Sequence, residues 1–192
     1  MLKKSLILFL VLFLFIGLVF PREKNKKSNF GLGFAINPAV PLYKLSLYGI
    51  SKGGAGFELA AVTNSKWKDE NDNYYGNIDN VTAEETFGDE KLSEVTGKTI
   101  IFGNIIFRLF RGLFVYGGPG FGSSQKFVKY DDPTHILGSH GKYWVESDED
   151  GESWVTVNTG MKFIVHSNFG IELGYVAKPK AFMFGASINL QY

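Results

Sequence analysis

The 192-residue sequence predicts an all-β protein, an eight-stranded antiparallel up-and-down transmembrane β-barrel with tight turns at one end and two long loops at the other. Three observations predict this fold: short segments in which apolar and polar residues alternate, a regular order of tight and long connections, and a polar face that combines glycine with charge. The last segment, "AFMFGASINLQY", shows the alternation clearly. One side of this strand carries Phe182, Phe184, Ala186, Ile188, Leu190 and Tyr192, and the other side carries small or polar residues.

Composition agrees with a strand-rich chain. Aromatic residues make up 16% of the sequence and 23 residues are glycine, a mixture that suits strands and tight turns. The net charge of +1 gives no reason to expect nucleic acid as a partner. Because the chain has no cysteine, disulfide bridges, thiolate metal sites, a cysteine nucleophile and an acylated cysteine are all excluded.

The N-terminus predicts export. Residues 1–20, "MLKKSLILFLVLFLFIGLVF", join two lysines to an apolar run and are predicted to be a signal peptide. A basic linker is predicted at 21–28 and the barrel at 29–192. The apolar run of about 15 residues is shorter than the ~20 that a spanning helix needs. An A-x-A cleavage motif is absent before "PREKNKKSN", so an uncleaved anchor helix stays open as the alternative.

Eight strands are predicted in order, at 29–37, 42–50, 55–62, 99–110, 113–122, 153–165, 169–177 and 181–192. The first and third, "NFGLGFAIN" and "AGFELAAV", alternate cleanly, and the fourth, sixth and seventh continue the same pattern. The second, "LYKLSLYGI", places Tyr48 and Ile50 on the polar side. The fifth, "FVYGGPGFG" with its flanks, is rich in glycine. Each is bounded by Gly, Pro, Asn or Asp, as strands commonly are.

The connections indicate which end of the barrel is which. Connections 51–54, 111–112 and 166–168 are tight and alternate with the long polar connections 63–98 and 123–152. The remaining two, "PAVP" and "KPK", are short and contain proline. All tight turns therefore lie at one end. In outer-membrane barrels this is the periplasmic end, and the long loops are extracellular.

The polar face predicts a charged interior. Glu58, Arg108, Lys162 and Glu172 all fall on it, among glycines that leave room in a narrow lumen. We expect these four charges to pair and plug the lumen. An exported soluble lipocalin-like barrel that binds a small apolar ligand has the same periodicity with the faces reversed. Glycine and charge on one face, with aromatics near the strand ends on the other, favour the membrane barrel.

The signal, the order of turns, the "FVYGGPGFG" strand and the terminal aromatic of "INLQY" resemble the small eight-stranded outer-membrane barrels of the OmpA transmembrane-domain, OmpX and opacity-protein type. The resemblance covers roughly residues 29–192. It implies a location in the bacterial outer membrane, with outer-membrane lipid and lipopolysaccharide as surroundings. It also implies that the barrel-assembly machinery reads the last strand, through Phe184, Ile188, Leu190 and Tyr192.

Catalytic, metal and cofactor sites are not predicted. His135 and His140, with Asp131 and Asp132, match no structural zinc spacing and are interpreted as solvated loop residues. A lipid A-modifying barrel enzyme remains an alternative function. It would require Ser153 to act with His135 or His140 at the membrane rim.

The long loops carry the functional prediction. They hold nine acids against four lysines at 63–98, and seven acids against three lysines at 123–152. We expect a structural or adhesion-like surface role, through contact with divalent cations that bridge lipopolysaccharide or with a basic partner, against the simpler interpretation that charge only solubilises long loops. The candidate contact aromatics, which could equally pack the loops on themselves, are Trp67, Tyr74, Tyr75, Tyr143 and Trp144.

Overall fold

The computed structural model describes residues 28–64, 73–75, 82–138, 140–166 and 168–191. The predicted signal at 1–20 and nearly all of the predicted linker at 21–28 lie outside these residues. Within the described ranges, none of the helical residues forms a helix long and apolar enough to cross a membrane.

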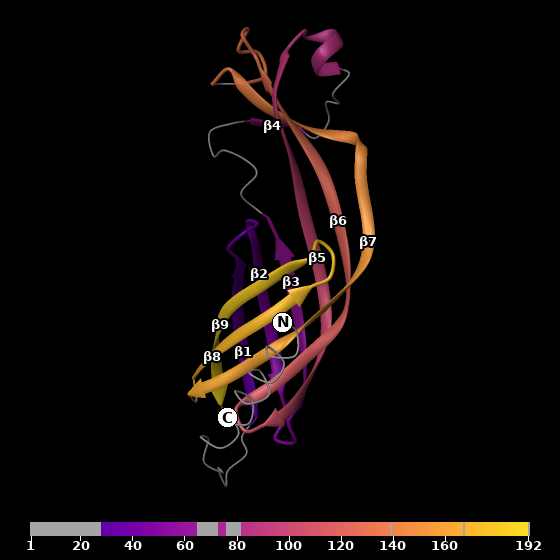
Figure 1. Cartoon of the computed structure of the whole chain (residues 1–192). Helices are drawn as coiled ribbons and strands as arrows, with labels where there is room; N and C mark the ends of the chain where they lie inside the picture. The colour runs from indigo at the N-terminus through magenta and orange to yellow at the C-terminus, as the bar shows by residue number, and fades with distance from the viewer. Residues whose placement is uncertain (1–27, 65–72, 76–81, 139, 167, 192) are drawn as a thin grey trace, which may run out of the picture.

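The described residues form one sheet of nine strands and a single short π-helix (Figure 1). The strands and the helix are β1 (Asn29–Asn37), β2 (Leu42–Ile50), β3 (Ala55–Thr63), β4 (Asn73–Tyr75), η1 (Thr82–Thr86), β5 (Glu90–Phe110), β6 (Leu113–Asp131), β7 (Lys142–His166), β8 (Phe169–Val176) and β9 (Ala181–Gln191).

Eight of the strands close into an antiparallel barrel. The order is β1, β2, β3, β5, β6, β7, β8 and β9, and β9 pairs with β1 to complete the ring. The short β4 stands outside it and pairs in parallel with the start of β7. Closure satisfies the backbone hydrogen bonds between strands, which is the condition for a sheet to span lipid. The predicted fold class is confirmed.

The apolar face of the barrel points outward. Along β1, buried and exposed residues alternate strictly, and the exposed residues include Leu32 and Phe34, 51% and 53% exposed. On other strands Phe107 is 54% and Ile188 is 63% exposed. This orientation contradicts the lipocalin-like alternative, in which the same residues would line an apolar interior.

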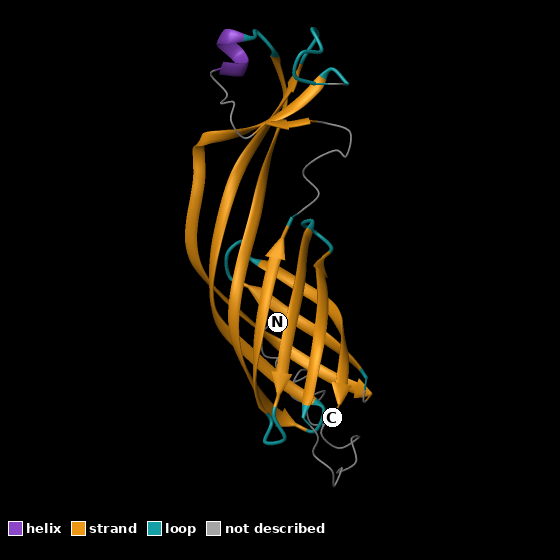
Figure 2. Ribbon diagram, turned by 180° about the vertical axis from the view of Figure 1, so that it is seen from behind, coloured by secondary structure: helices purple, strands orange, loops and turns teal. Residues whose placement is uncertain are grey.

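The tight turns all lie at one end of the barrel, as Figure 2 shows. They join β2 to β3, β5 to β6 and β7 to β8. Gly112 adopts a φ of 74° in the two-residue turn between β5 and β6, a conformation that glycine takes at little cost. We call this the periplasmic end, following the rule that outer-membrane barrels have their short turns there.

Three strands are much longer than a membrane requires. β5, β6 and β7 have 21, 19 and 25 residues, whereas β1, β2 and β3 have nine each. A tilted transmembrane strand needs only ~9–11 residues. The surplus projects as a curved ribbon beyond the barrel (Figures 1 and 2). We call this part, residues 90–98, 124–131 and 142–152 with β4 and η1, the extension.

The extension corrects the predicted strand ends. The sequence predicts that the fourth strand begins at Thr99, that the fifth ends at Gly122 and that the sixth begins at Ser153, with loops between them. Strand structure instead begins at Glu90, continues to Asp131 and begins again at Lys142. The reason is that alternation marks a strand only where one face contacts lipid. Beyond the membrane the backbone pairing continues without that pattern.

A row of hydroxyl residues marks the outer limit of the lipid-facing surface. Thr63 pairs with Thr99, Thr99 with Ser123, and Ser123 with Ser153. The equivalent row one step deeper in the barrel is apolar and consists of Ala61, Ile101, Phe121 and Val155. The outward side chains therefore change from apolar to polar at the same level on four neighbouring strands. We call the row of Thr63, Thr99, Ser123 and Ser153 the outer rung.

Candidate functional site

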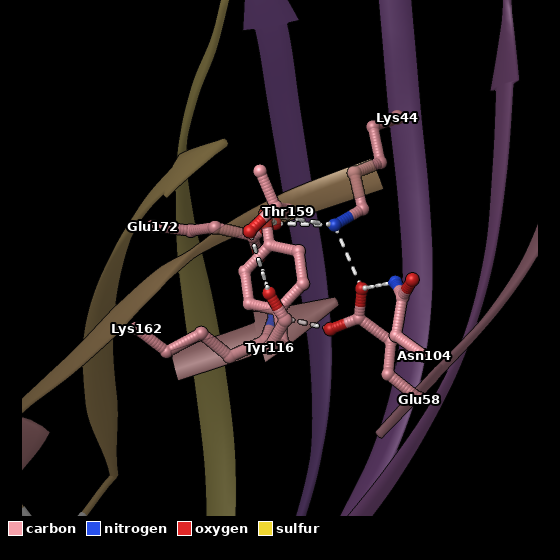
Figure 3. Close-up of polar contacts among 7 residues, drawn as sticks. All are labelled: Lys44, Glu58, Asn104, Tyr116, Thr159, Lys162 and Glu172. Carbon is pink, nitrogen blue, oxygen red and sulfur yellow. Dashed lines mark hydrogen bonds and ion pairs between the residues drawn. The ribbon is translucent and has the colours of Figure 1, made fainter. Parts of the chain in front are cut away.

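The lumen contains a closed ring of four buried charges (Figure 3). Lys44 on β2, Glu58 on β3, Lys162 on β7 and Glu172 on β8 each have side chains no more than 1% exposed. Two ammonium groups face two carboxylates, so the ring is neutral as a whole. A single unpaired charge at this depth would be very costly.

Each carboxylate in the ring bridges both lysines. Glu58 places Oε1 2.7 Å from Lys44 Nζ and Oε2 2.6 Å from Lys162 Nζ. Glu172 does the same from the other side, because Lys44 donates to its Oε1 and Lys162 to its Oε2. Anion and cation alternate around the ring, and like charges occupy opposite corners.

Neutral groups complete the coordination of the charges. The Tyr116 hydroxyl donates to Glu172 Oε1 over 2.8 Å, and Asn104 Nδ2 donates to Glu58 Oε1 over 3.0 Å. Lys44 Nζ lies 4.4 Å from the centre of the Tyr116 ring, and Lys162 Nζ lies 4.5 Å from that of Tyr48. Contact with an aromatic face partly replaces the water that each ammonium loses on burial.

Glycines on facing strands make room for the ring. A Cβ atom at Gly33 would lie 2.5 Å from Ser46 Oγ and 3.2 Å from Glu172 Oε2. A Cβ atom at Gly160 or at Gly174 would lie 2.4 Å from the Tyr116 hydroxyl oxygen. The glycines of the polar face therefore have a packing role, which is to admit large polar side chains into a narrow barrel.

Apolar layers lie above and below the charges. Along β5 the inward residues run from Ile100 and Phe102, through Asn104 beside the ring, to Ile106. The upper layer, toward the extension, consists of Ala35, Leu42, Ala60, Val62, Ile100, Phe102, Val176, Ala181 and Met183. The lower layer, toward the periplasmic end, consists of Tyr48, Ile50, Ile106, Phe114 and Tyr116.

Three of the four predicted lumen charges meet, and the fourth does not. Glu58, Lys162 and Glu172 are in the ring. Arg108 lies at the periplasmic end, half-buried, with its guanidinium carbon 5.2 Å from the centre of the Phe114 ring. Its backbone N–H donates to the carbonyl of Gly54 over 2.8 Å. The alternation of side chains along β5 predicts that Arg108 points inward, but it does not tell how deep in the barrel the side chain lies. The lower apolar layer separates Arg108 from the ring.

Lys44 takes the place that the sequence prediction gave to Arg108. The alternation along β2 also predicts that Lys44 points inward, because Lys44 and Tyr48 lie on the same side of this strand and Tyr48 falls on the polar face. The signal was weak since β2 has apolar residues on both faces: Leu45 and Leu47 are 60% and 46% exposed, while Leu42 and Ile50 are buried.

The extension has an apolar core of its own, separate from the barrel. We call it the surface core. Ala83 of η1, Val128, Tyr130, Tyr143 and Val145 are buried together, with Tyr75 and Leu137 packed against them. The rings of Tyr130 and Tyr143 stack with their centres 5.7 Å apart.

Tyrosine–carboxylate hydrogen bonds hold the η1 segment onto the sheet. The Tyr130 hydroxyl donates to Glu84 Oε1 and the Tyr143 hydroxyl donates to Asp89 Oδ2, each over 2.8 Å. Burial, followed by the adjoining carboxylate, raises the pKa of both tyrosines above the ordinary value. Both hydroxyls therefore remain protonated donors throughout the physiological range.

The predicted contact aromatics divide between core and surface. Tyr143 and Trp144 are buried, 0% and 3% exposed, and Tyr75 donates to the carbonyl of Leu137 over 2.7 Å. These three stabilise the extension, which agrees with the alternative that loop aromatics pack on one another. Tyr74 is 38% exposed and donates to Glu146 Oε2 over 2.5 Å. Trp67 lies outside the described residues.

Asp132 organises the hairpin loop between β6 and β7. Its carboxylate accepts from the backbone N–H groups of Leu137 and Gly138 over 2.6 and 2.7 Å, and from the Thr134 hydroxyl over 2.6 Å. Burial acts to raise the pKa of the Asp132 carboxyl, but these hydrogen bonds outweigh burial and lower it to about 2. The loop is therefore tied to a charged carboxylate at any ordinary pH.

The enzymatic alternative is not supported by the geometry. His135 and His140 lie in that hairpin loop, before β7 begins at Lys142. Ser153 lies on the outer rung, at the opposite end of the extension part of β7. The described ranges contain no group of three or more His, Cys, Asp or Glu residues arranged to hold a metal ion. No catalytic residue is assigned.

The predicted assembly residues lie on the lipid face of β9. Phe184, Ile188 and Leu190 are 49%, 63% and 61% exposed, on the strand that closes the barrel against β1. Tyr192 lies outside the described residues. Recognition of this strand by the assembly machinery stays a prediction.

Comparison with known proteins finds similarity at the level of solved structures. No family model and no curated protein matches the sequence. Ail, the attachment invasion locus protein of Yersinia pestis, solved in complex with the heparin analogue sucrose octasulfate, aligns over 85% of this chain and 96% of its own, with 12% identity and a TM-score of 0.48. The N-terminal β-barrel domain of Pseudomonas aeruginosa OprF aligns over 86% and 98%, with 11% identity and a TM-score of 0.41. Neisserial surface protein A aligns over 86% and 95%, with 11% identity and a TM-score of 0.37.

The architecture rests on the strand pairing and the surface of this chain itself. An even number of antiparallel strands, full closure, an outward apolar band, tight turns at one end and a polar interior are together the properties of outer-membrane barrels. The band ends at the outer rung on four neighbouring strands. The chain is therefore a small eight-stranded transmembrane β-barrel of the outer-membrane type.

Proposed function

We propose that this protein is a surface-interaction protein, in which the barrel is a rigid base with a closed lumen and the extension is the contact element. The observation that carries the proposal is the surface core. A three-stranded ribbon with its own buried residues holds a fixed shape beyond the bilayer, so less conformational entropy is lost when a partner binds. Flexible loops that served only to cover the barrel would not need a core.

The charge of the extension indicates a basic partner. Of the 19 acidic residues in the chain, nine lie at 63–98 and seven at 123–152. Glu85 and Glu90 are exposed in the described part of this region. A surface of one sign attracts partners of the opposite sign and accelerates their association. A basic protein surface, or divalent cations that bridge the surface to lipopolysaccharide, would meet this requirement.

The proposal is tested by removing the extension along the outer rung. Thr63 pairs directly with Thr99, and Ser123 pairs directly with Ser153. Replacing 64–98 and 124–152 by Asn-Gly turns therefore joins residues that are already neighbours. We expect this trimmed variant to fold, with a gel mobility that shifts on boiling. Captured in zwitterionic vesicles, the full chain should bind a short poly-L-lysine peptide, more weakly as salt rises, and the trimmed variant should not.

A charge variant provides the matched control. Glu85→Gln with Glu90→Gln removes two exposed charges and keeps the surface core, and it should bind the peptide more weakly than the full chain but more strongly than the trimmed variant. Equal binding of the peptide by the full chain and the trimmed variant would contradict the proposal.

The closed lumen is tested separately by electrical recording. The upper layer, the charge ring and the lower layer lie at successive levels of the barrel interior, which supports a closed lumen. We expect no steady conductance steps in a planar lipid bilayer, for the full chain and for the trimmed variant alike, because the filling lies within the barrel. Conductance that appears only after trimming would place the seal in the extension instead, and steady steps from the full chain would exclude a plug.

A further inference from the structure

We propose that the periplasmic end of the barrel carries a binding surface for the headgroups of anionic phospholipids, formed by Lys52, Arg108 and Arg111. We call these three residues the basic rim. The inference is independent of the proposed role of the extension, which lies at the opposite end of the molecule.

The first observation is that the acidic and basic side chains lie at different levels along the barrel axis. Within the described residues, the carboxylates of the barrel wall, Glu58 and Glu172, are both committed to the neutral ring. The other described acids lie in the extension and in the segments 87–89 and 132–141 that adjoin it, on the far side of the outer rung. The turns at the periplasmic end contribute Lys52 and Arg111, and the last inward position of β5 contributes Arg108. Among the described residues, the two ends thus carry opposite net charge.

The second observation is that these cations come from adjoining parts of the wall. β3 and β5 are neighbours, and the pair Ala55 and Phe107 is the last before the turn. At the next position, Arg108 N–H donates to the carbonyl of Gly54, two residues from Lys52. A Cβ atom on Gly54 would lie 2.6 Å from the Arg108 Cβ, so glycine permits this close approach. Arg111 follows in the turn that ends β5.

The third observation selects lipid over other anionic partners. Phe107, Leu109 and Phe110, which flank Arg108 in the sequence, are 54%, 47% and 46% exposed, and the first two lie on the outward side of β5. The cations therefore adjoin the edge of the apolar band, at the level where phosphate groups of the bilayer lie. Long basic side chains at such an edge extend toward the headgroups. The arginine guanidinium matches the two oxygens of a phosphodiester.

Arg108 is also held in a suitable place. Its guanidinium is stacked over Phe114, at 5.2 Å from the ring centre, and it remains half-exposed below the lower layer. The aromatic ring limits its motion on the lumen side. The positive charge of Arg108 therefore lies at the mouth of the barrel and takes no part in the ring of buried charges.

The test compares lipid retention by the folded full chain in detergent. Native mass spectrometry would follow phosphatidylglycerol and phosphatidylcholine titrated in equal amounts. We expect a preference for phosphatidylglycerol in the full chain, reduced by about fivefold for each cation removed in the series Lys52→Gln, Arg108→Gln and Arg111→Gln. A control with Lys178→Gln and Lys180→Gln, at the turn between β8 and β9 on the other end, should retain the full preference. Folding of each variant is checked by its gel mobility before and after boiling.

No preference in the full chain, an unchanged preference in the triple variant, or an equal loss in the Lys178/Lys180 control would overturn the proposal. Retention of a poly-glutamate peptide in place of the lipid would overturn it in favour of an acidic protein partner. Should the triple variant fail to fold, Lys52→Gln alone carries the test, since Lys52 is exposed on a turn and is not part of the wall.

Discussion

Replacing Glu172 by glutamine should lower the free energy of unfolding by about 3–5 kcal/mol, the usual cost of leaving a buried charge without its partner. In the variant, Lys44 and Lys162 would share Glu58 alone, and the lumen would carry a net positive charge. Urea unfolding in lipid vesicles, followed by tryptophan fluorescence, measures the loss.

A compensating variant separates charge balance from packing. Lys162 and Glu172 are directly paired across β7 and β8. Lys162→Met combined with Glu172→Gln restores neutrality and keeps the pair between Lys44 and Glu58, whose Nζ and Oε1 atoms are 2.7 Å apart. The double variant should recover more than half of the lost stability.

An exposed pair supplies the matched control. Glu152→Gln breaks the surface pair with Lys178, whose side chains are 63% and 48% exposed, and it should change stability by no more than ~1 kcal/mol. A Glu172→Gln variant as stable as the Glu152→Gln control would contradict the importance of the charge ring.

Replacing Gly118 by alanine should destabilise the barrel by at least about 1–3 kcal/mol, the range for forcing an extra group into a filled site. The added Cβ atom would lie 1.9 Å from the Gly103 carbonyl oxygen and 2.8 Å from the Asn104 Cα. Both are backbone atoms of β5, so neither can move aside as a side-chain end could. Urea unfolding and the fraction with shifted gel mobility measure the effect.

Gly103, on the neighbouring strand β5, is the control. The nearest neighbour of a Cβ atom at Gly103 would be the edge of the Phe57 ring, at 3.7 Å, which is ordinary contact. Gly103→Ala should therefore be neutral or slightly stabilising, because alanine reduces the freedom of the unfolded chain. Equal effects of the two substitutions would show that the close approach of β5 and β6 at Gly118 is not a constraint.

The positions of β1, β2 and β8 were predictable nearly to the residue, and those of β5, β6 and β7 were not. In the membrane, lipid on one side and a polar lumen on the other impose a period of two on every strand. Above Thr99, Ser123 and Ser153 both faces of the ribbon can contact water or protein, so the period disappears while the backbone pairing continues. The same loss of pattern concealed β4, η1 and the surface core.

The sequence predicted that charged residues would pair inside the barrel, but not which residues would form the ring. The alternation along the strands identified Glu58, Lys162 and Glu172 as inward-facing. It identified Arg108 in the same way, although Arg108 lies outside the ring, and Lys44 was not predicted. Which inward residues meet depends on their height along the barrel axis. That height is set by strand tilt and by the register between strands far apart in the sequence.

The sequence by itself determined the closed antiparallel barrel, which face contacts lipid and which end carries the tight turns. These properties are local, because each strand and each turn carries its own pattern. Only the tertiary structure decided that Lys44 completes the ring of charges, that Arg108 lies at the periplasmic mouth, and that the long connections form a ribbon with a core. These depend on the register between separate strands, and registers are fixed only when the barrel closes.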